Sequence, residues 1–175
     1  GYALNKKTYE HPSQLHYVIN ELKSKPDSTR VLTEMWNVDD LPLMSLTPCG
    51  HLTQWSVSNG KLVLEVRFRS NDFALGMVSN VYQYSILHKL VAMECGYQTG
   101  DLIYTIHNLH YYDRHEQTLL KQFSYFDKHI KNTSLDVLPK GIINNFQSIH
   151  NFTWNQIELF TQNSNLPKYK YEIAI

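Results

Sequence analysis

The chain has 175 residues, 42% of them hydrophobic and 13% aromatic, which favours a globular protein with a buried core over a disordered one. Its 16 basic and 16 acidic residues give a formal charge of zero, so the sequence lacks the overall positive charge of a nonspecific nucleic-acid binder. Its two cysteines are neither spaced as a metal-binding pair nor frequent enough for a disulfide framework, and no apolar run reaches the roughly 18 residues of a membrane span. We therefore expect a cytoplasmic protein that binds neither membranes nor a specific nucleic acid.

The first part of the chain predicts a helix followed by a strand. Between Ser13 and Lys25 the apolar residues recur at the spacing of one helix face, with Ser13 as the N-cap and Pro26 as the stop. These apolar residues are Leu15, Val18, Ile19 and Leu22. Residues 31–36 are predicted to form a strand with Arg30 at its start, and residues 39–46 form a connector.

A hairpin is the strongest local prediction. Asn59-Gly60 separates two alternating apolar runs, and both turn residues adopt positive φ at low cost. The second run, residues 62–69, alternates apolar and polar side chains, so one face of this strand is expected to be buried. Pairing the two strands brings Cys49 and Arg69 to the same edge of the sheet.

Cys49 and Arg69 together suggest a nucleophile beside an anion site. A neighbouring guanidinium lowers the pKa of a thiol, whereas a lone cysteine without such a neighbour is usually a small buried hydrophobe. The Arg69 fork, with the hydroxyl of Ser70, suits bidentate contact with a phosphate. The alternative is a surface ion pair with Glu65.

The longest apolar stretch, residues 78–95, predicts a helix that ends at Gly96. Apolar residues cover much of its circumference, so we expect it in the centre of the domain. Asn80, near its start, is the polar exception, and a helix-start cap is its simplest explanation.

The remaining elements are predicted from shorter signals. Residues 101–112 read as a strand that leads into a helix, with Asp113 and Glu116 as a capping pair. Three nearby histidines, His107, His110 and His115, raise the alternative of a zinc site. The alternation of strand side chains and the lack of a cysteine pair disfavour zinc.

Towards the C-terminus three features are predicted. Residues 142–149 are expected to form a strand, and Thr153 with Gln156 forms a capping-box signature for a short helix. The closing residues 169–175 alternate and end apolar, which also fits an edge strand.

Taken together, a series of separated motifs resembles the thymidylate synthase family in order and in spacing. The motifs are Pro48-Cys49 with Gln54, Arg69-Ser70-Asn71-Asp72, Leu75-Gly76, Asn80 and His110-Tyr111-Tyr112, with further matches in residues 20–41 and 169–175. Residues 46–76 resemble the branch of the family found in some Bacillus strains and their phages. The opening Gly1 is not a methionine and resembles a point well inside the family's chain, so we expect the C-terminal two thirds of the family fold.

The resemblance implies an α/β fold, with a mixed twisted sheet, a long buried central helix and a single catalytic domain over residues 1–175. It implies a homodimer formed through the sheet face. The implied reaction transfers a one-carbon unit from the co-substrate 5,10-methylenetetrahydrofolate to C5 of dUMP, after Cys49 has attacked C6, and gives dTMP. No metal is expected.

The resemblance also implies a role for each motif residue. Cys49 and Arg69 are the expected catalytic pair. The nucleotide-binding residues are Arg30, Gln54, Arg69, Ser70, Asn80, His110 and Tyr112, and the folate-binding residues are Asp72 and Ile175. Asn80 selects uracil because an amide offers both a donor and an acceptor to the O4/N3 edge. Arg30 reaches the phosphate in the partner's site, and the C-terminal tail covers the ligands and excludes water.

Some positions depart from the family's pattern and keep alternatives open. Thr29 stands where the family has a second arginine, Gly50 where it often has histidine, and residues 77–79 and 107–108 also differ. One alternative is a dUMP hydroxymethylase, in which water captures the one-carbon unit. The other is a nucleotide-binding or partner-binding relative without turnover.

Overall fold

The computed structural model describes residues 3–8, 10–129, 140–160 and 167–173, and the structural statements below concern these residues. The chain divides into two compact units, residues 1–110 and residues 111–175, and each is described by itself. The single catalytic domain expected from the sequence stays a prediction. No helix among the described residues has the length and apolarity that a membrane crossing requires.

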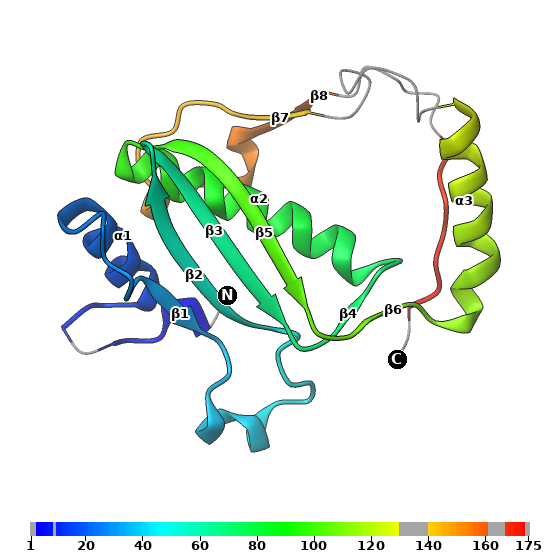
Figure 1. The fold of residues 1–175 in the computed structure, drawn as a ribbon, viewed down its shortest axis with the longest axis horizontal. Coiled ribbons are helices and arrows are strands. Elements are labelled where there is room, and N and C mark those ends of the chain that lie inside the picture. Colours follow the sequence, from blue (N-terminus) through cyan, green and yellow to red (C-terminus); the bar gives the residue numbers. More distant parts are fainter. Residues whose placement is uncertain (1–2, 9, 130–139, 161–166, 174–175) are drawn as a thin grey trace. The chain divides into compact units, whose positions relative to one another are not determined.

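A mixed four-stranded sheet is the framework of the first unit (Figure 1). Its strands are β1 (Leu32–Glu34), β2 (Gly50–Ser58), β3 (Lys61–Phe68) and β5 (Gln98–Ile106), in the order β1-β2-β3-β5. The first two pairings are antiparallel, and β3 pairs with β5 in parallel. A parallel pair needs a crossover, which the helix between β3 and β5 provides. The mixed sheet predicted from the sequence is confirmed.

The predicted hairpin joins β2 to β3. Asn59 has a φ of 51° and Gly60 a φ of 74°, which is the left-handed conformation that this turn requires. One face of β3 is almost completely shielded from solvent, as the alternation predicted, through Leu62, Leu64, Val66 and Phe68. On the opposite face Arg67 is exposed and forms an ion pair with Glu65, in which the two side chains are 2.9 Å apart.

Two helices cover the buried side of this sheet. Helix α1 (Gln14–Ser24) begins at Ser13, whose hydroxyl accepts a hydrogen bond from the amide of His16 at 3.2 Å. Helix α2 (Gly76–Cys95) ends at Gly96, whose φ of 77° is the left-handed cap that the sequence predicted. Figure 1 shows α2 running across the sheet, and α1 packs against both α2 and β1.

The burial of α2 is less complete than its sequence predicted. The buried residues His88, Leu90, Val91 and Ala92 all lie in its C-terminal half. Val78 and Tyr82, near the start of α2, are 65% and 45% exposed. The expected central position therefore describes the C-terminal half of α2, whereas its N-terminal half is exposed within the first unit.

Other short elements complete the first unit. They are the 3-10 turns η1 (Ala3–Asn5) and η2 (Val38–Leu43) and the two-residue strands β4 (Asn71–Asp72) and β6 (Leu109–His110), which pair in parallel. Strand β1 is shorter than the predicted 31–36. The side-chain amide of Gln14 binds both backbone groups of Glu34, each at 2.8 Å, where β1 ends.

The second unit contains helix α3 and a small hairpin. Its elements are η3 (Asp113–His115), α3 (Glu116–His129), β7 (Lys140–Ile143), η5 (Ile149–Asn151), η6 (Trp154–Gln156) and β8 (Ile157–Phe160), with β7 antiparallel to β8. The predicted strand over 142–149 is wrong in position, because pairing with β8 ends at Ile143. The capping box of Thr153 and Gln156 is confirmed.

Two further expectations for the second unit differ from the structure. Tyr112, not Asp113, is the N-cap residue of η3, and Asp113 lies in the first turn, where a carboxylate favours the helix dipole. Residues 167–173 form no strand, and Ile175 lies outside the described residues.

His88 is a buried polar residue of the core. Its side chain is 1% exposed, its Nε2 donates to the carbonyl of Leu62 at 2.7 Å, and its ring meets that of Trp55 edge-on. Burial lowers the pKa of His88, and the bond to Leu62 and the charge of Asp101 oppose this only in part. The folded state therefore favours the neutral form of the His88 imidazole.

We predict that Gly100→Ala destabilises the first unit. A Cβ at position 100 would lie 2.6 Å from the carbonyl oxygen of Leu62, at the irregularity between β3 and β5, so the strands must shift. Overpacking of this kind costs about 1–3 kcal/mol in the free energy of unfolding, measured by urea denaturation. The neighbouring exposed Thr99→Ala is the control, and an equal effect of both substitutions would contradict the prediction.

A second prediction concerns pH. The pKa of His88 is lower in the folded chain than the ordinary value of about 6.5. As the pH decreases, His88 is therefore protonated in the unfolded chain at a higher pH than in the folded chain. The free energy of unfolding should therefore be highest above about pH 6.5 and should fall as the pH decreases below this value. His88→Gln, which keeps a donor but does not titrate, should give a flatter urea midpoint between pH 5 and 7. Parallel pH profiles of the two proteins would contradict this.

Candidate functional site

Arg69 fixes the loop that carries Cys49. Its Nε donates to the carbonyl of Pro48 at 2.9 Å, and its Nη2 donates to both the carbonyl and the hydroxyl of Thr47 at 2.9 Å. Its backbone amide donates to the carbonyl of Cys49, also at 2.9 Å. A single residue at the end of β3 therefore holds three successive residues before β2, and this places Cys49 at the sheet edge that the hairpin predicted.

Arg69 has donors that the loop does not use. No hydrogen bond of Nη1 is found among the described residues, and the guanidinium lies 5.9 Å from the ring centre of Trp36. A guanidinium has five N–H donors, so two of them are left for an anion after the loop is bound. The alternative expectation, an ion pair with Glu65, is met by Arg67 instead.

Asn71 and Asn80 form an amide pair next to this loop. The Nδ2 of Asn80 donates to the Oδ1 of Asn71 at 3.2 Å, and the hydroxyl of Tyr104 donates to the backbone carbonyl of Asn80 at 2.7 Å. Asn71 is 2% exposed, and its own Nδ2 is buried without a partner among the described residues. Asn80 is thus held in place while its amide oxygen keeps no partner within the described chain, which suits recognition of an N–H donor.

Ser70, Asp72 and His110 meet where β4 pairs with β6. Asp72 is opposite His110 in this register, and the hydroxyl of Ser70 lies 3.4 Å from Nδ1 of His110. One carboxylate oxygen of Asp72 accepts the amide of Ala74 at 3.0 Å. The structure therefore brings together three of the residues that the motifs singled out.

The two cysteines have different environments, and both are free thiols. Cys49 is half-buried at the start of β2. Burial raises the pKa of Cys95 to about 11, so its thiol is protonated at neutral pH. Of the two, Cys49 is the residue whose backbone Arg69 holds.

A side chain at Gly50 would be crowded by two aromatic residues. A Cβ there would lie 3.0 Å from the ring of Phe68 and 3.1 Å from the hydroxyl of Tyr84. Phe68 is 2% exposed and stacks on Tyr104, with ring centres 5.2 Å apart. Aromatic side chains therefore fill the space beside the residue that follows Cys49.

Gln54 lies apart from this group. It lies in β2, five residues beyond Cys49, which is about 17 Å at the rise of a strand. The neighbouring Thr53 and Trp55 are buried against the helices, so Gln54 points to the opposite, open face of the sheet. The predicted role of Gln54 in nucleotide binding gains no support from this position.

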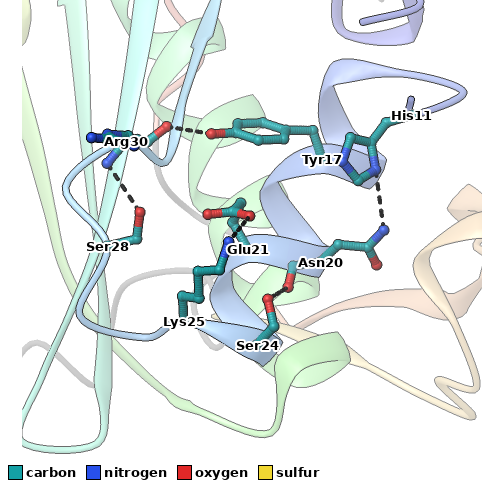
Figure 2. Close-up of polar contacts among 8 residues, drawn as sticks. All are labelled: His11, Tyr17, Asn20, Glu21, Ser24, Lys25, Ser28 and Arg30. Atoms are coloured by element: carbon teal, nitrogen blue, oxygen red, sulfur yellow. Dashed lines mark hydrogen bonds and ion pairs between the residues drawn. The ribbon is translucent and has the colours of Figure 1, made fainter. Parts of the chain in front are cut away.

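Arg30 lies at a different place in the first unit (Figure 2). Its backbone is held on both sides, because its carbonyl accepts the hydroxyl of Tyr17 at 2.8 Å and its amide donates to the hydroxyl of Ser28 at 3.2 Å. Figure 2 shows the Arg30 side chain extending away from α1, and no partner of its guanidinium is found among the described residues. Arg30 also lines a cavity of about 1060 Å³ with Lys7 and Trp36, which Cys49 does not line.

The other predicted residues belong to the second unit or lie outside the described residues. Tyr112 precedes η3, and Arg114 lies 5.2 Å from its ring. The role of Ile175 cannot be described structurally, because residues 174–175 are outside the described part. Among the described residues no group of three His, Cys, Asp or Glu side chains has the geometry to hold a metal ion.

Sequence reasoning missed several residues that shape the site. Trp36 and Thr47 contact Arg69. Asn71 and Tyr104 contact Asn80. Asn71 was part of a motif and carried a signal, since an amide between a serine and an aspartate at a strand end is rarely an ordinary core residue. Tyr104 carried none, because strand alternation predicts that it faces inward but not what its hydroxyl binds.

Comparisons with known proteins show which family the chain belongs to. The family model described as thymidylate synthase matches residues 2–175. A thymidylate synthase of Fusobacterium nucleatum subsp. nucleatum is 50% identical over 175 residues, which are 100% of the chain and 60% of that protein. One from Bacillus phage phi3T is 37% identical over 179 residues and is covered to 61%.

A solved structure is also similar. The thermostable thymidylate synthase A from Bacillus subtilis superposes with a TM-score of 0.84 at 36% identity, over 99% of the chain and 61% of its own length. The chain therefore spans about three fifths of the length of the relatives that it matches. Relatives from Bacillus and its phage are in keeping with the branch that residues 46–76 resemble.

We predict that Arg69→Lys loosens the loop before β2. An ammonium group cannot replace the planar fork that binds Pro48 and Thr47 together, so the loss should be about 1.5–3 kcal/mol in the free energy of unfolding. Hydrogen exchange of residues 47–49 should accelerate in the same variant. Arg67→Lys is the matched control and should change little, because Arg67 is exposed. Equal effects of the two substitutions would refute the role given to Arg69.

Proposed function

Because the chain belongs to the thymidylate synthase family, we propose that it transfers a one-carbon unit to C5 of dUMP, through attack of Cys49 on C6, and so forms dTMP. The observation that carries this proposal is the grouping of Cys49, Arg69 and Asn80 within one unit. A thiol beside an anchored guanidinium and a fixed amide supplies a nucleophile, an anion site and a base-recognition group.

The first step makes C5 reactive. The sulfur of Cys49 forms a bond to C6 of the pyrimidine, and the electron pair of the C5–C6 double bond moves towards the O4 oxygen, which leaves C5 nucleophilic. After C5 has accepted the carbon and lost its proton, the bond between sulfur and C6 breaks and Cys49 is released. The role of Arg69 is twofold, because it fixes the backbone around Cys49 and directs Nη1 to the nucleotide phosphate.

Recognition of uracil is assigned to Asn80. Its amide oxygen accepts the N3–H of the base, and the second N–H of its Nδ2 donates to O4. The pair with Asn71 supports this assignment, because it fixes which end of the Asn80 amide presents the acceptor. Ser70 adds a donor for the phosphate, and His110 with Tyr112 binds the sugar hydroxyl.

The co-substrate is 5,10-methylenetetrahydrofolate, which supplies the carbon and the hydride that completes the methyl group. The carboxylate of Asp72 offers a hydrogen-bond acceptor to such a ligand. One of its carboxylate oxygens accepts the amide of Ala74, and no partner of the other is found among the described residues. That oxygen suits the N–H groups of a pterin, while Ile175 is assigned to the tail that covers the folate.

We also propose a homodimer formed through the open face of the sheet. Leu32 and Ile103 on this face are 40% and 45% exposed, and Gln54 lies on the same face. A second copy would cover these apolar residues, since an exposed sheet face of this kind favours association. The Arg30 guanidinium, which has no partner among the described residues, is assigned to the partner's phosphate site.

The relatives favour the methyl product over the alternatives, since each carries the name thymidylate synthase. The departures at residues 77–79 and 107–108 are the grounds for the hydroxymethylase, and Thr29 is the ground for the relative without turnover. A cytoplasmic location agrees with the two free thiols.

The test is covalent trapping. Incubation of the chain with 5-fluoro-dUMP and methylenetetrahydrofolate should give an adduct by intact-mass analysis, because the fluorine at C5 cannot leave as a proton does. Cys49→Ser should abolish the adduct. Cys95→Ser is the matched control and should retain it, because the Cys95 thiol, with a pKa of about 11, is protonated. Absence of the adduct, or its persistence in Cys49→Ser, would overturn the proposal.

A further inference from the structure

His115 is a fully buried polar side chain in the second unit, and the proposed reaction gives it no role. It ends the turn η3 and is 1% exposed. Leu119, one turn further along α3, is the other buried side chain of this helical region. A buried imidazole requires a hydrogen-bond partner, so the partner of His115 indicates its structural role.

The partner of His115 is the backbone of the C-terminal segment. Nε2 of His115 donates to the carbonyl of Glu172 at 2.8 Å. The other nitrogen, Nδ1, is buried and has no partner among the described residues. The single N–H of the neutral imidazole therefore donates to a chain segment 57 residues away in sequence.

Aromatic contacts extend this connection in both directions. The ring of His115 lies 5.7 Å from that of Tyr112 and 5.3 Å from that of Tyr171, edge-on in each case. The hydroxyl of Tyr171 also donates to the side-chain amide of Gln122 on α3. One imidazole thus touches both a residue assigned to the sugar and the segment that leads to the C-terminus.

The C-terminal segment depends on such contacts. Residues 167–173 form neither helix nor strand, so no backbone ladder fixes them. Figure 1 shows this segment lying along α3. Tyr169 lines a cavity of about 450 Å³ with residues of the same helix, so the segment is attached to α3 by side chains at several points.

We propose that His115 is a positioning residue that fixes residues 167–173 on α3 and couples them to Tyr112. The bond to Glu172 fixes the backbone, and the edge-on rings set the positions of Tyr112 and Tyr171 relative to each other. The catalytic consequence rests on the proposed function, in which Tyr112 binds the sugar and the C-terminus covers the folate. The attachment itself does not rest on it.

Two substitutions separate the parts of this role. His115→Phe keeps a ring of similar size but removes the donor. His115→Gln places an amide donor at the reach of Nε2 but removes the ring. His150→Phe is the matched control, because His150 is an exposed histidine of the same unit.

The first measurement is hydrogen exchange of the whole chain by mass spectrometry. Loss of the bond in His115→Phe should accelerate exchange of residues 167–173 about tenfold, while α3 is unchanged. His115→Gln should restore part of the protection, and His150→Phe should match the unmodified chain. Unchanged exchange in residues 167–173 of His115→Phe would overturn the proposal. Equal acceleration throughout residues 111–129 in both His115 variants would also overturn it, because His115 would then only stabilise the unit.

The second measurement tests the coupling with dUMP. Saturating dUMP should slow exchange of residues 167–173 in the unmodified chain. His115→Phe should still bind dUMP but lose this protection. Failure of dUMP to bind the unmodified chain would overturn the proposed function, while the first measurement would still decide the attachment. Equal protection by dUMP in both proteins would overturn the coupling.

Discussion

The fork of Arg69 on the carbonyls of Thr47 and Pro48 is the constraint on which the candidate site depends. These two carbonyls precede β2 and have no strand to pair with, so a side chain must satisfy them. Arg69 does so from the end of β3, and its amide binds the next carbonyl, that of Cys49. The hairpin register therefore sets the position of the thiol, because Gly50 pairs with Phe68.

Much of the first unit follows from local chemistry that a sequence displays. Asn59-Gly60 forms its turn because both residues tolerate positive φ, and the alternation of β3 matches its buried face. The burial of α2 could not be derived in this way, because composition does not reveal that the sheet covers one side of the helix only. The extent of β1 was missed for a related reason, since Gln14 binds the backbone of Glu34 from 20 residues away.

The site was predictable as a set of residue types rather than as a set of contacts. The motifs identified Cys49, Arg69 and Asn80, and the structure brings their elements together. They did not reveal that two of the five guanidinium donors of Arg69 bind backbone carbonyls, because any residue can supply a carbonyl. Gln54 is different, since its predicted role in positioning the nucleotide stays a prediction, while strand geometry directs its side chain to the open face of the sheet.

The crowding around Gly50 constrains how this sequence can evolve. A side chain at position 50 would press on the ring of Phe68 and the hydroxyl of Tyr84, and Phe68 is itself packed against Tyr104. A histidine at this position therefore requires the Phe68 ring and the Tyr84 hydroxyl to shift by a few tenths of an ångström. Positions 50 and 68 are expected to vary together among descendants of this chain.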